Sequence, residues 1–157
     1  MATKKHYIKK SFESTGKSSD TSANIYESML VSEAWHTLTP SQQRLYICCK
    51  AQYYAEKQKP ATEENPNGSI LYFTMNRYKW STKYQLYKDN NRAAFYRDME
   101  ALIEKGFVRC VESGRNTRTK SIYAFSDKWH QFGTEAFAVF PNEMTSSMLK
   151  KLCEKEA

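Results

Sequence analysis

The sequence predicts an α+β fold in which one long helix leads directly into a two-stranded ribbon. Residues 90–105 have the apolar spacing of an α-helix, because their large apolar side chains recur at i, i+4, i+7 and i+8. These side chains are Phe95, Met99, Leu102 and Ile103. Asn90-Asn91-Arg92 open the helix, and Gly106 ends it, since glycine adopts the left-handed capping conformation at the least cost.

The ribbon follows at once. Residues 107–113 and 121–125 alternate between apolar and polar side chains, as half-buried strands do. Residues 114–120 join them as a polar tip that carries three cations and no acid. An exposed turn needs no such charge for stability, so contact with DNA phosphates or with the minor groove is a good reason for it. The candidate contact residues in the tip are Arg115, Asn116, Thr117, Arg118 and Lys120.

The other segments complete the order helix–strand–helix–helix–strand–wing–strand, which is typical of a winged helix-turn-helix, with extra helices at both ends. Residues 25–38 predict a short helix, and Ser41 is the expected cap of a helix over 42–57. Residues 70–74 predict a strand, and residues 84–87, capped by Ser81 or Thr82, predict the first helix of the helix-turn-helix. A helical turn at 126–129, a strand or extended segment at 136–140 and an amphipathic helix over 141–154 follow.

We therefore divide the chain into a basic arm at 1–24, a winged-helix domain at 25–132 and a helical extension at 133–157. The arm has five lysines against two acids and few apolar residues, which favours disorder. It is either a phosphate-binding arm or a solvated tail. The last helix either packs on the domain or makes a dimer contact.

The charge of the chain favours an anionic partner. There are 24 Lys and Arg against 17 Asp and Glu, a formal charge of +7 and a pI of about 9.2. Such a balance is typical of proteins that bind nucleic acid, although a merely basic protein has it as well. The 14% of aromatic residues indicates a packed core.

The cysteines and histidines do not favour a metal site. Cys48 and Cys49 are adjacent, the other two cysteines stand alone, and the three histidines are scattered, so we expect no zinc and no other cofactor. Reduced thiols in a cytoplasm are the default. With no apolar run of 18 residues and no secretory signal, we expect a cytoplasmic protein without a membrane partner.

The exposed face of the long helix supplies the candidate residues for reading duplex DNA in the major groove. Arg97 can pair with guanine through two hydrogen bonds, Asn90 can read adenine, and Ala93 offers a methyl contact for thymine. Glu100 and Glu104 lie on the same face further along, so only the first two turns are expected to enter the groove. Further candidate DNA contacts lie beside this face, where phosphates would be, and in the segment before the helix. They are Lys83, Asn91, Arg92 and Tyr96.

These segments resemble winged-helix proteins carried by plasmids, phages and integrative conjugative elements of Gram-positive bacteria. The resemblance covers about residues 26–132. It rests on 91–107, on the tip 114–120 with Ser121-Ile122-Tyr123-Ala124-Phe125-Ser126, on Met29-Leu30 with Ser32-Glu33-Ala34-Trp35, and on Leu45-Tyr46, Lys50 and Tyr53-Tyr54. It implies sequence-specific binding of double-stranded DNA in replication, conjugative transfer or transcription control.

Two other classes of function stay open. An enzyme is not favoured, because the chain has no P-loop, no G-x-S-x-G and no H-E-x-x-H motif. A nucleophilic tyrosine among the 11 tyrosines, or a role as accessory subunit of a DNA-processing enzyme, remains an alternative. The other is a winged helix that binds a protein partner, such as a replication or transfer protein, or a second copy of itself.

Overall fold

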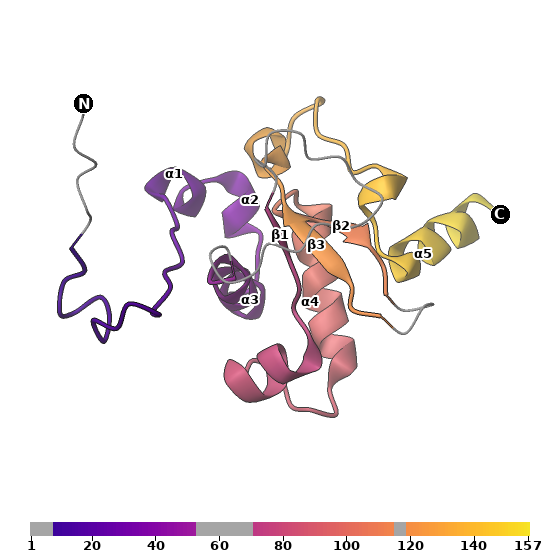
Figure 1. The fold of residues 1–157 in the computed structure, drawn as a ribbon. Helices are drawn as coiled ribbons and strands as arrows, with labels where there is room; N and C mark the ends of the chain where they lie inside the picture. Colours follow the sequence, from indigo (N-terminus) through magenta and orange to yellow (C-terminus); the bar gives the residue numbers. More distant parts are fainter. Residues whose placement is uncertain (1–7, 53–70, 115–118) are drawn as a thin grey trace, which may run out of the picture.

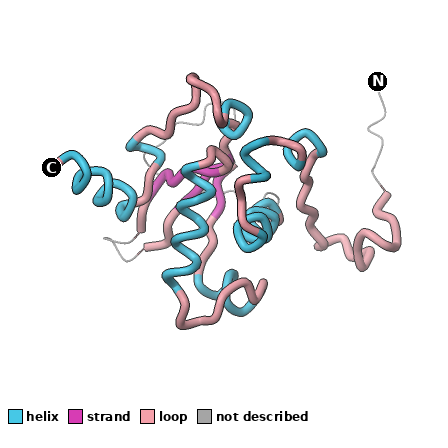
Figure 2. Tube along the Cα trace, turned by 180° about the vertical axis from the view of Figure 1, so that it is seen from behind, coloured by secondary structure: helices cyan, strands magenta, loops and turns pink. Residues whose placement is uncertain are grey.

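The fold is α+β, as predicted, and is built around a small antiparallel sheet. The computed structural model describes residues 8–52, 71–114 and 119–157. The sheet has the strand order β1-β3-β2, with β1 at Tyr72–Phe73, β2 at Val108–Glu112 and β3 at Ile122–Phe125. Helix α4 (Arg92–Glu104) lies behind this sheet in Figure 1, and α3 (Pro40–Lys50) lies beside α4, as the view from behind in Figure 2 also shows.

The hairpin predicted from alternation is confirmed. Strand β2 pairs with β3 so that Val108 lies opposite Phe125 and Cys110 opposite Tyr123. The predicted first strand over 70–74 is confirmed in its described part as β1, in which Phe73 lies opposite Tyr123. Strand β3 of the hairpin is therefore the central strand, paired with β2 on one side and with β1 on the other.

Helix α4 begins and ends as its local chemistry predicts. The side-chain oxygen of Asn91 accepts a hydrogen bond from the Ala94 N–H at 3.3 Å. Gly106 has a φ of +82° and follows the helix. A Cβ there would lie 2.7 Å from backbone atoms of Lys128 and Trp129, and the Trp129 N–H donates to the Gly106 carbonyl at 3.0 Å. Glycine is thus required both for its conformation and for this close approach.

The predicted core face of α4 is confirmed. Phe95, Leu102, Ile103 and Tyr123 are all buried. Trp80 stacks on Phe95 with ring centroids 5.3 Å apart. Such burial excludes water from large apolar surfaces, which is the main term that stabilises the fold.

The N-terminal helices differ from their predicted bounds. Residues 25–38 form two short helices, α1 at Glu27–Leu30 and α2 at Glu33–His36, rather than one. Ser32 interrupts the helix because its hydroxyl caps α2, accepting from the Trp35 N–H at 3.2 Å.

Helix α3 begins earlier than predicted, and Ser41 is not its cap. Thr39 caps it in a reciprocal capping box with Gln42, and Pro40 occupies the first helical position. Proline is favoured there because that position needs no N–H donor. The helix ends at Lys50, and residues 53–57 of its predicted range lie outside the described residues.

The predicted helix over 84–87 is wrong. The helix before α4 is a π-helix, η1, at Tyr78–Lys83, and residues 84–87 are not helical. The Asn76 side chain accepts from the Lys79 N–H at 3.0 Å near its start. Buried Trp80 packs η1 against α4 through its stacking on Phe95, so the helix lies earlier in the sequence than predicted.

The C-terminal extension is partly as predicted. A 3-10 helix, η2, at Lys128–Gln131 confirms the turn expected after the hairpin. No strand forms over 136–140. The predicted helix over 141–154 is split into a 3-10 turn, η3, at Pro141–Glu143 and α5 at Ser146–Glu156, because Thr145 caps α5 by accepting from the Met148 N–H at 3.2 Å.

Candidate nucleic-acid interface

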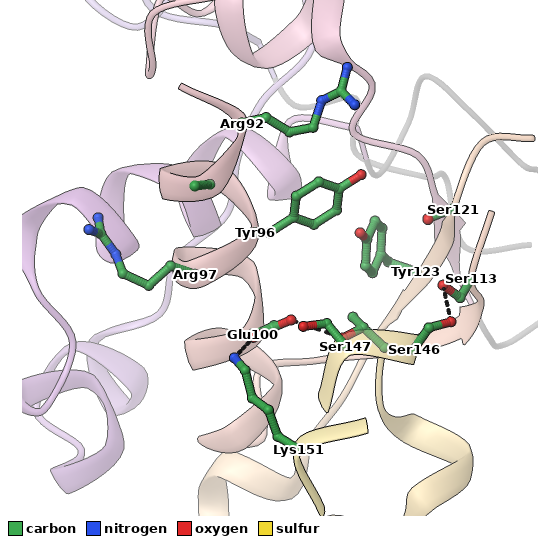
Figure 3. Close-up of a pocket in the computed structure, with 12 residues that line it drawn as sticks. Arg92, Tyr96, Arg97, Glu100, Ser113, Ser121, Tyr123, Ser146, Ser147 and Lys151 are labelled. Atoms are coloured by element: carbon green, nitrogen blue, oxygen red, sulfur yellow. Dashed lines mark hydrogen bonds and ion pairs between the residues drawn. The ribbon is translucent and has the colours of Figure 1, made fainter. Parts of the chain in front are cut away.

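The first two turns of α4 present their outer face to solvent. Arg92, Ala93, Tyr96 and Arg97 are exposed there, as predicted. In Figure 3, Arg92 and Tyr96 extend toward the hairpin, whereas Arg97 extends from the other side of the helix. The predicted phosphate contacts Arg92 and Tyr96 and the predicted base-reading residue Arg97 thus lie on two sides of one helix, with Ala93 exposed on the same two turns.

A hollow of about 450 Å³ lies between α4, the ends of the hairpin strands and the first turn of α5. We call it the α5 groove. Arg92 and Tyr96 line it from α4, and Lys151 lines it from α5. Hydroxyl groups contribute much of the rest of its wall, from Ser113, Ser121, Tyr123, Thr145, Ser146 and Ser147.

A second hollow, also of about 450 Å³, continues toward η1, and we call it the η1 groove. Arg77 and Lys120 are among the residues that line it, and its described lining includes no acid. The two grooves share four lining residues, so they lie next to one another along α4 and the hairpin, and we call the pair the trough. The shared residues are Arg92, Tyr96, Ser121 and Tyr123.

Glu100 corrects one prediction about this face. It was expected to be exposed, but it is buried beneath the start of α5. Thr145 Oγ1 donates to its Oε1 at 3.1 Å, and Lys151 Nζ donates to its Oε2 at 3.1 Å. The position faces a helix that comes 45 residues later, which helical periodicity alone does not predict. Glu104 is exposed, as expected.

A further hydrogen bond ties α5 to the hairpin. The Ser146 and Ser113 hydroxyls lie 2.9 Å apart, and Figure 3 shows this contact opposite the pair of Glu100 and Lys151. Met148 of α5 is buried in the core. Of the two predicted roles of the last helix, packing on the domain is therefore present.

Arg97 is held in place by its neighbour. Its Nε donates to Asp98 Oδ1 at 3.0 Å, and its side chain is 69% exposed. Asp98 is buried, and its other oxygen accepts hydrogen bonds from the hydroxyls of Ser41 and Tyr87. The guanidinium is thus anchored at Nε, and its outer N–H groups can meet a ligand.

These contacts set the ionisation of Asp98. Burial raises the pKa of its carboxyl, but hydrogen bonds from Arg97, Ser41 and Tyr87 outweigh burial and leave the pKa below its usual range. For Tyr87, burial and the hydrogen bond to this carboxylate raise the pKa of the phenol far above its usual value. The cluster therefore keeps a carboxylate and a neutral phenol at neutral pH.

We expect Asp98→Asn to lower the free energy of unfolding by about 1–3 kcal/mol at pH 7, because it removes a charged acceptor from three donors. Since the pKa of Asp98 is lower in the folded chain than in the unfolded one, its contribution is present above about pH 4 and is lost as the pH falls through the folded pKa. Urea unfolding from pH 7 down to about pH 2 should show the two proteins converging.

Asp89→Asn is the matched control. Asp89 also has a lowered pKa, through its hydrogen bond to Arg77, but both partners are exposed, and such pairs contribute little to stability. A destabilisation by Asp98→Asn that stayed constant with pH would contradict the assignment of the charge.

The remaining predicted residues are placed as follows. Lys83 ends η1 with Nζ 5.2 Å from the centre of the Tyr84 ring, and Asn90 is exposed in the turn before α4. Asn91 is the cap of α4. These three do not line the trough. Four predicted tip residues lie outside the described residues, namely Arg115, Asn116, Thr117 and Arg118.

The base of the tip is described on both sides. The Gly114 N–H donates to the Ser121 hydroxyl at 3.0 Å, and the Thr119 N–H donates to the Gly114 carbonyl at 3.2 Å. Lys120 is exposed next to this base and lines the η1 groove. The tip thus leaves the sheet beside the trough.

Sequence reasoning missed Arg77 and Lys151. Arg77 makes a two-point ion pair with Asp89, which joins the start of η1 to the turn before α4. Lys151 is one of several lysines in an amphipathic helix, and no local pattern singles it out. Both reach the interface only through tertiary packing.

Within residues 8–52, 71–114 and 119–157, no group of three or more His, Cys, Asp or Glu side chains is arranged to hold a metal ion. No helix in these same ranges has the length and apolarity needed to cross a membrane.

Comparisons of this chain with protein-family models, with curated proteins and with solved structures found no match.

Proposed function

We propose that this protein is a winged helix that binds double-stranded DNA sequence-specifically, without catalysis, in the cytoplasm. The order α3, β1, η1, α4, β2, β3 with a β1-β3-β2 sheet supports this fold. In it, α4 is the recognition helix, and the segment between β2 and β3 is the wing.

The observation that carries the proposal is the trough beside the exposed start of α4. Five cations line it against one acid among its described lining residues, Glu100, which is buried and pairs with Lys151. Two of the cations, Arg77 and Arg97, also pair with acids beside the trough. The cations are Arg77, Arg92, Arg97, Lys120 and Lys151. A cationic surface next to an exposed helix suits DNA, because the phosphates bind the cations while the helix reads base edges.

The process served by this binding rests on the resemblance alone. We propose replication, conjugative transfer or transcription control of a mobile element, with duplex DNA as the partner and no metal or other cofactor.

The test begins with duplexes selected from a random pool by the full-length protein. We expect enrichment of a common sequence, and binding to that sequence and to a scrambled duplex should both weaken as salt rises, with the selected duplex bound more tightly throughout. Absence of salt-dependent binding to any duplex would contradict the proposal.

A protein-binding winged helix is the second candidate. One observation favours it: an apolar hollow of about 380 Å³ between the end of α4, residues 137–144 and α5. Val139, Met144, Met148 and Leu152 are among the residues that line it. Absence of salt-dependent binding to any duplex would favour this protein-binding function.

A further inference from the structure

We infer that α5 is a third DNA-contacting element, in which Lys151 binds a phosphate of the strand that follows the trough. The inference rests on the proposed function and adds a contact outside the recognition helix and the wing. It concerns the C-terminal extension, for which the sequence predicted only packing or a dimer contact.

The first step is the continuity of the trough. The grooves on either side of Tyr96 share Arg92, Tyr96, Ser121 and Tyr123, so they adjoin one another along α4. Cations lie along the whole length: Arg77 and Lys120 at the η1 end, Arg92 in the shared part and Lys151 at the α5 end. A chain of phosphates is the ligand that fits a row of cations of this kind.

The second step is the state of Glu100. An exposed carboxylate here would repel phosphate. Instead its side chain is 8% exposed, and both oxygens accept hydrogen bonds, one from Thr145 and one from Lys151. The acid is therefore turned inward and held by two donors, so at this end of the trough the exposed member of the ion pair is the cation, Lys151.

The third step is that Lys151 keeps N–H donors that Glu100 does not use. Its ammonium group has three N–H donors, and the contact with Glu100 takes one of them. The side chain is 65% exposed, so the remaining donors face the groove or solvent. In Figure 3 it rises from α5 toward α4, on the side of the groove opposite Arg92.

The experiment compares two neighbouring lysines of the same helix. Lys151→Gln removes the charge but keeps an N–H donor for Glu100. Lys150→Gln removes the same charge from a side chain that is 80% exposed, pairs with Glu154 and does not line the trough. Duplex affinity is measured in the full-length protein from about 0.1 to 1 M salt.

Lys151→Gln should lower the slope of log affinity against log salt by about one unit, whereas Lys150→Gln should leave it nearly unchanged. A slope change of one unit corresponds to about tenfold weaker binding at 0.1 M salt, with affinities converging near 1 M. A purely structural role of Lys151 would move the unfolding midpoint without changing this slope.

A gain-of-charge variant covers the case in which Lys151→Gln loses stability. Ser147→Lys adds a cation to the same wall and leaves Glu100 and Lys151 unchanged in sequence, and it should steepen the slope by about one unit. Equal slopes for wild type, Lys151→Gln and Ser147→Lys would overturn the inference, while wild-type duplex binding would still uphold the proposed function. No salt-dependent duplex binding by the wild type would overturn both.

Discussion

Leu102→Ala is expected to lower the free energy of unfolding by about 2–5 kcal/mol, the largest effect of any single change proposed for this chain. Leu102 is fully buried on the core face of α4. Removing its outer carbons forfeits their burial and leaves a cavity that helices and sheet on both sides cannot readily fill.

The measurement is a denaturant midpoint at constant slope, and Leu30→Ala is the matched control. Leu30 ends α1 and is 43% exposed, so the same truncation there removes far less buried surface. Equal shifts for the two variants would contradict the packing of α4 described above.

Arg97→Ala is expected to cost about 1–3 kcal/mol in binding to the selected duplex and to relax discrimination at one base pair. Its Nε is fixed by Asp98 while its outer N–H groups face solvent. That arrangement suits the two parallel hydrogen bonds by which arginine recognises guanine. Scrambled duplex should lose much less affinity, because most of that binding comes from the phosphates.

Arg97→Lys separates charge from geometry. Lysine keeps the positive charge but not the planar fork, so the salt slope should persist while discrimination falls. The paired change Arg115→Ala with Arg118→Ala should do the reverse: it should weaken selected and scrambled duplexes together and lower the slope by about one unit for each phosphate that is no longer bound. Wild-type binding in all these variants would remove this face as a DNA interface.

Local chemistry was sufficient to predict the centre of the fold. The apolar spacing of Phe95, Leu102 and Ile103 predicted the correct buried face of α4, and Gly106 marked its end. Alternation predicted the strands of the hairpin. In each case the signal lies within a few residues of the element it describes.

The misplaced elements depend on partners that are distant in sequence. Trp80 sets the position of η1 by stacking on Phe95, and no pattern within 78–87 reveals that contact. Helical periodicity places Glu100 on the exposed face of α4. It is buried because Thr145 and Lys151, which are distant in sequence, pack over it. Lys151 enters the candidate site by the same route, so helix α4 could be predicted from the sequence and the α5 side of the trough beside it could not.

On the proposed function, the cover that α5 places over Glu100 limits how many base pairs α4 of one molecule can read. The open part of α4, residues 92–97, is about 9 Å long at 1.5 Å per residue, and base pairs are spaced by about 3.4 Å. A single helix of this length then contacts about three base pairs, and a three-base-pair sequence occurs very often in any genome. On the proposed function, we therefore expect a target that repeats this short sequence at intervals of about one DNA turn, so that more than one copy of the protein binds.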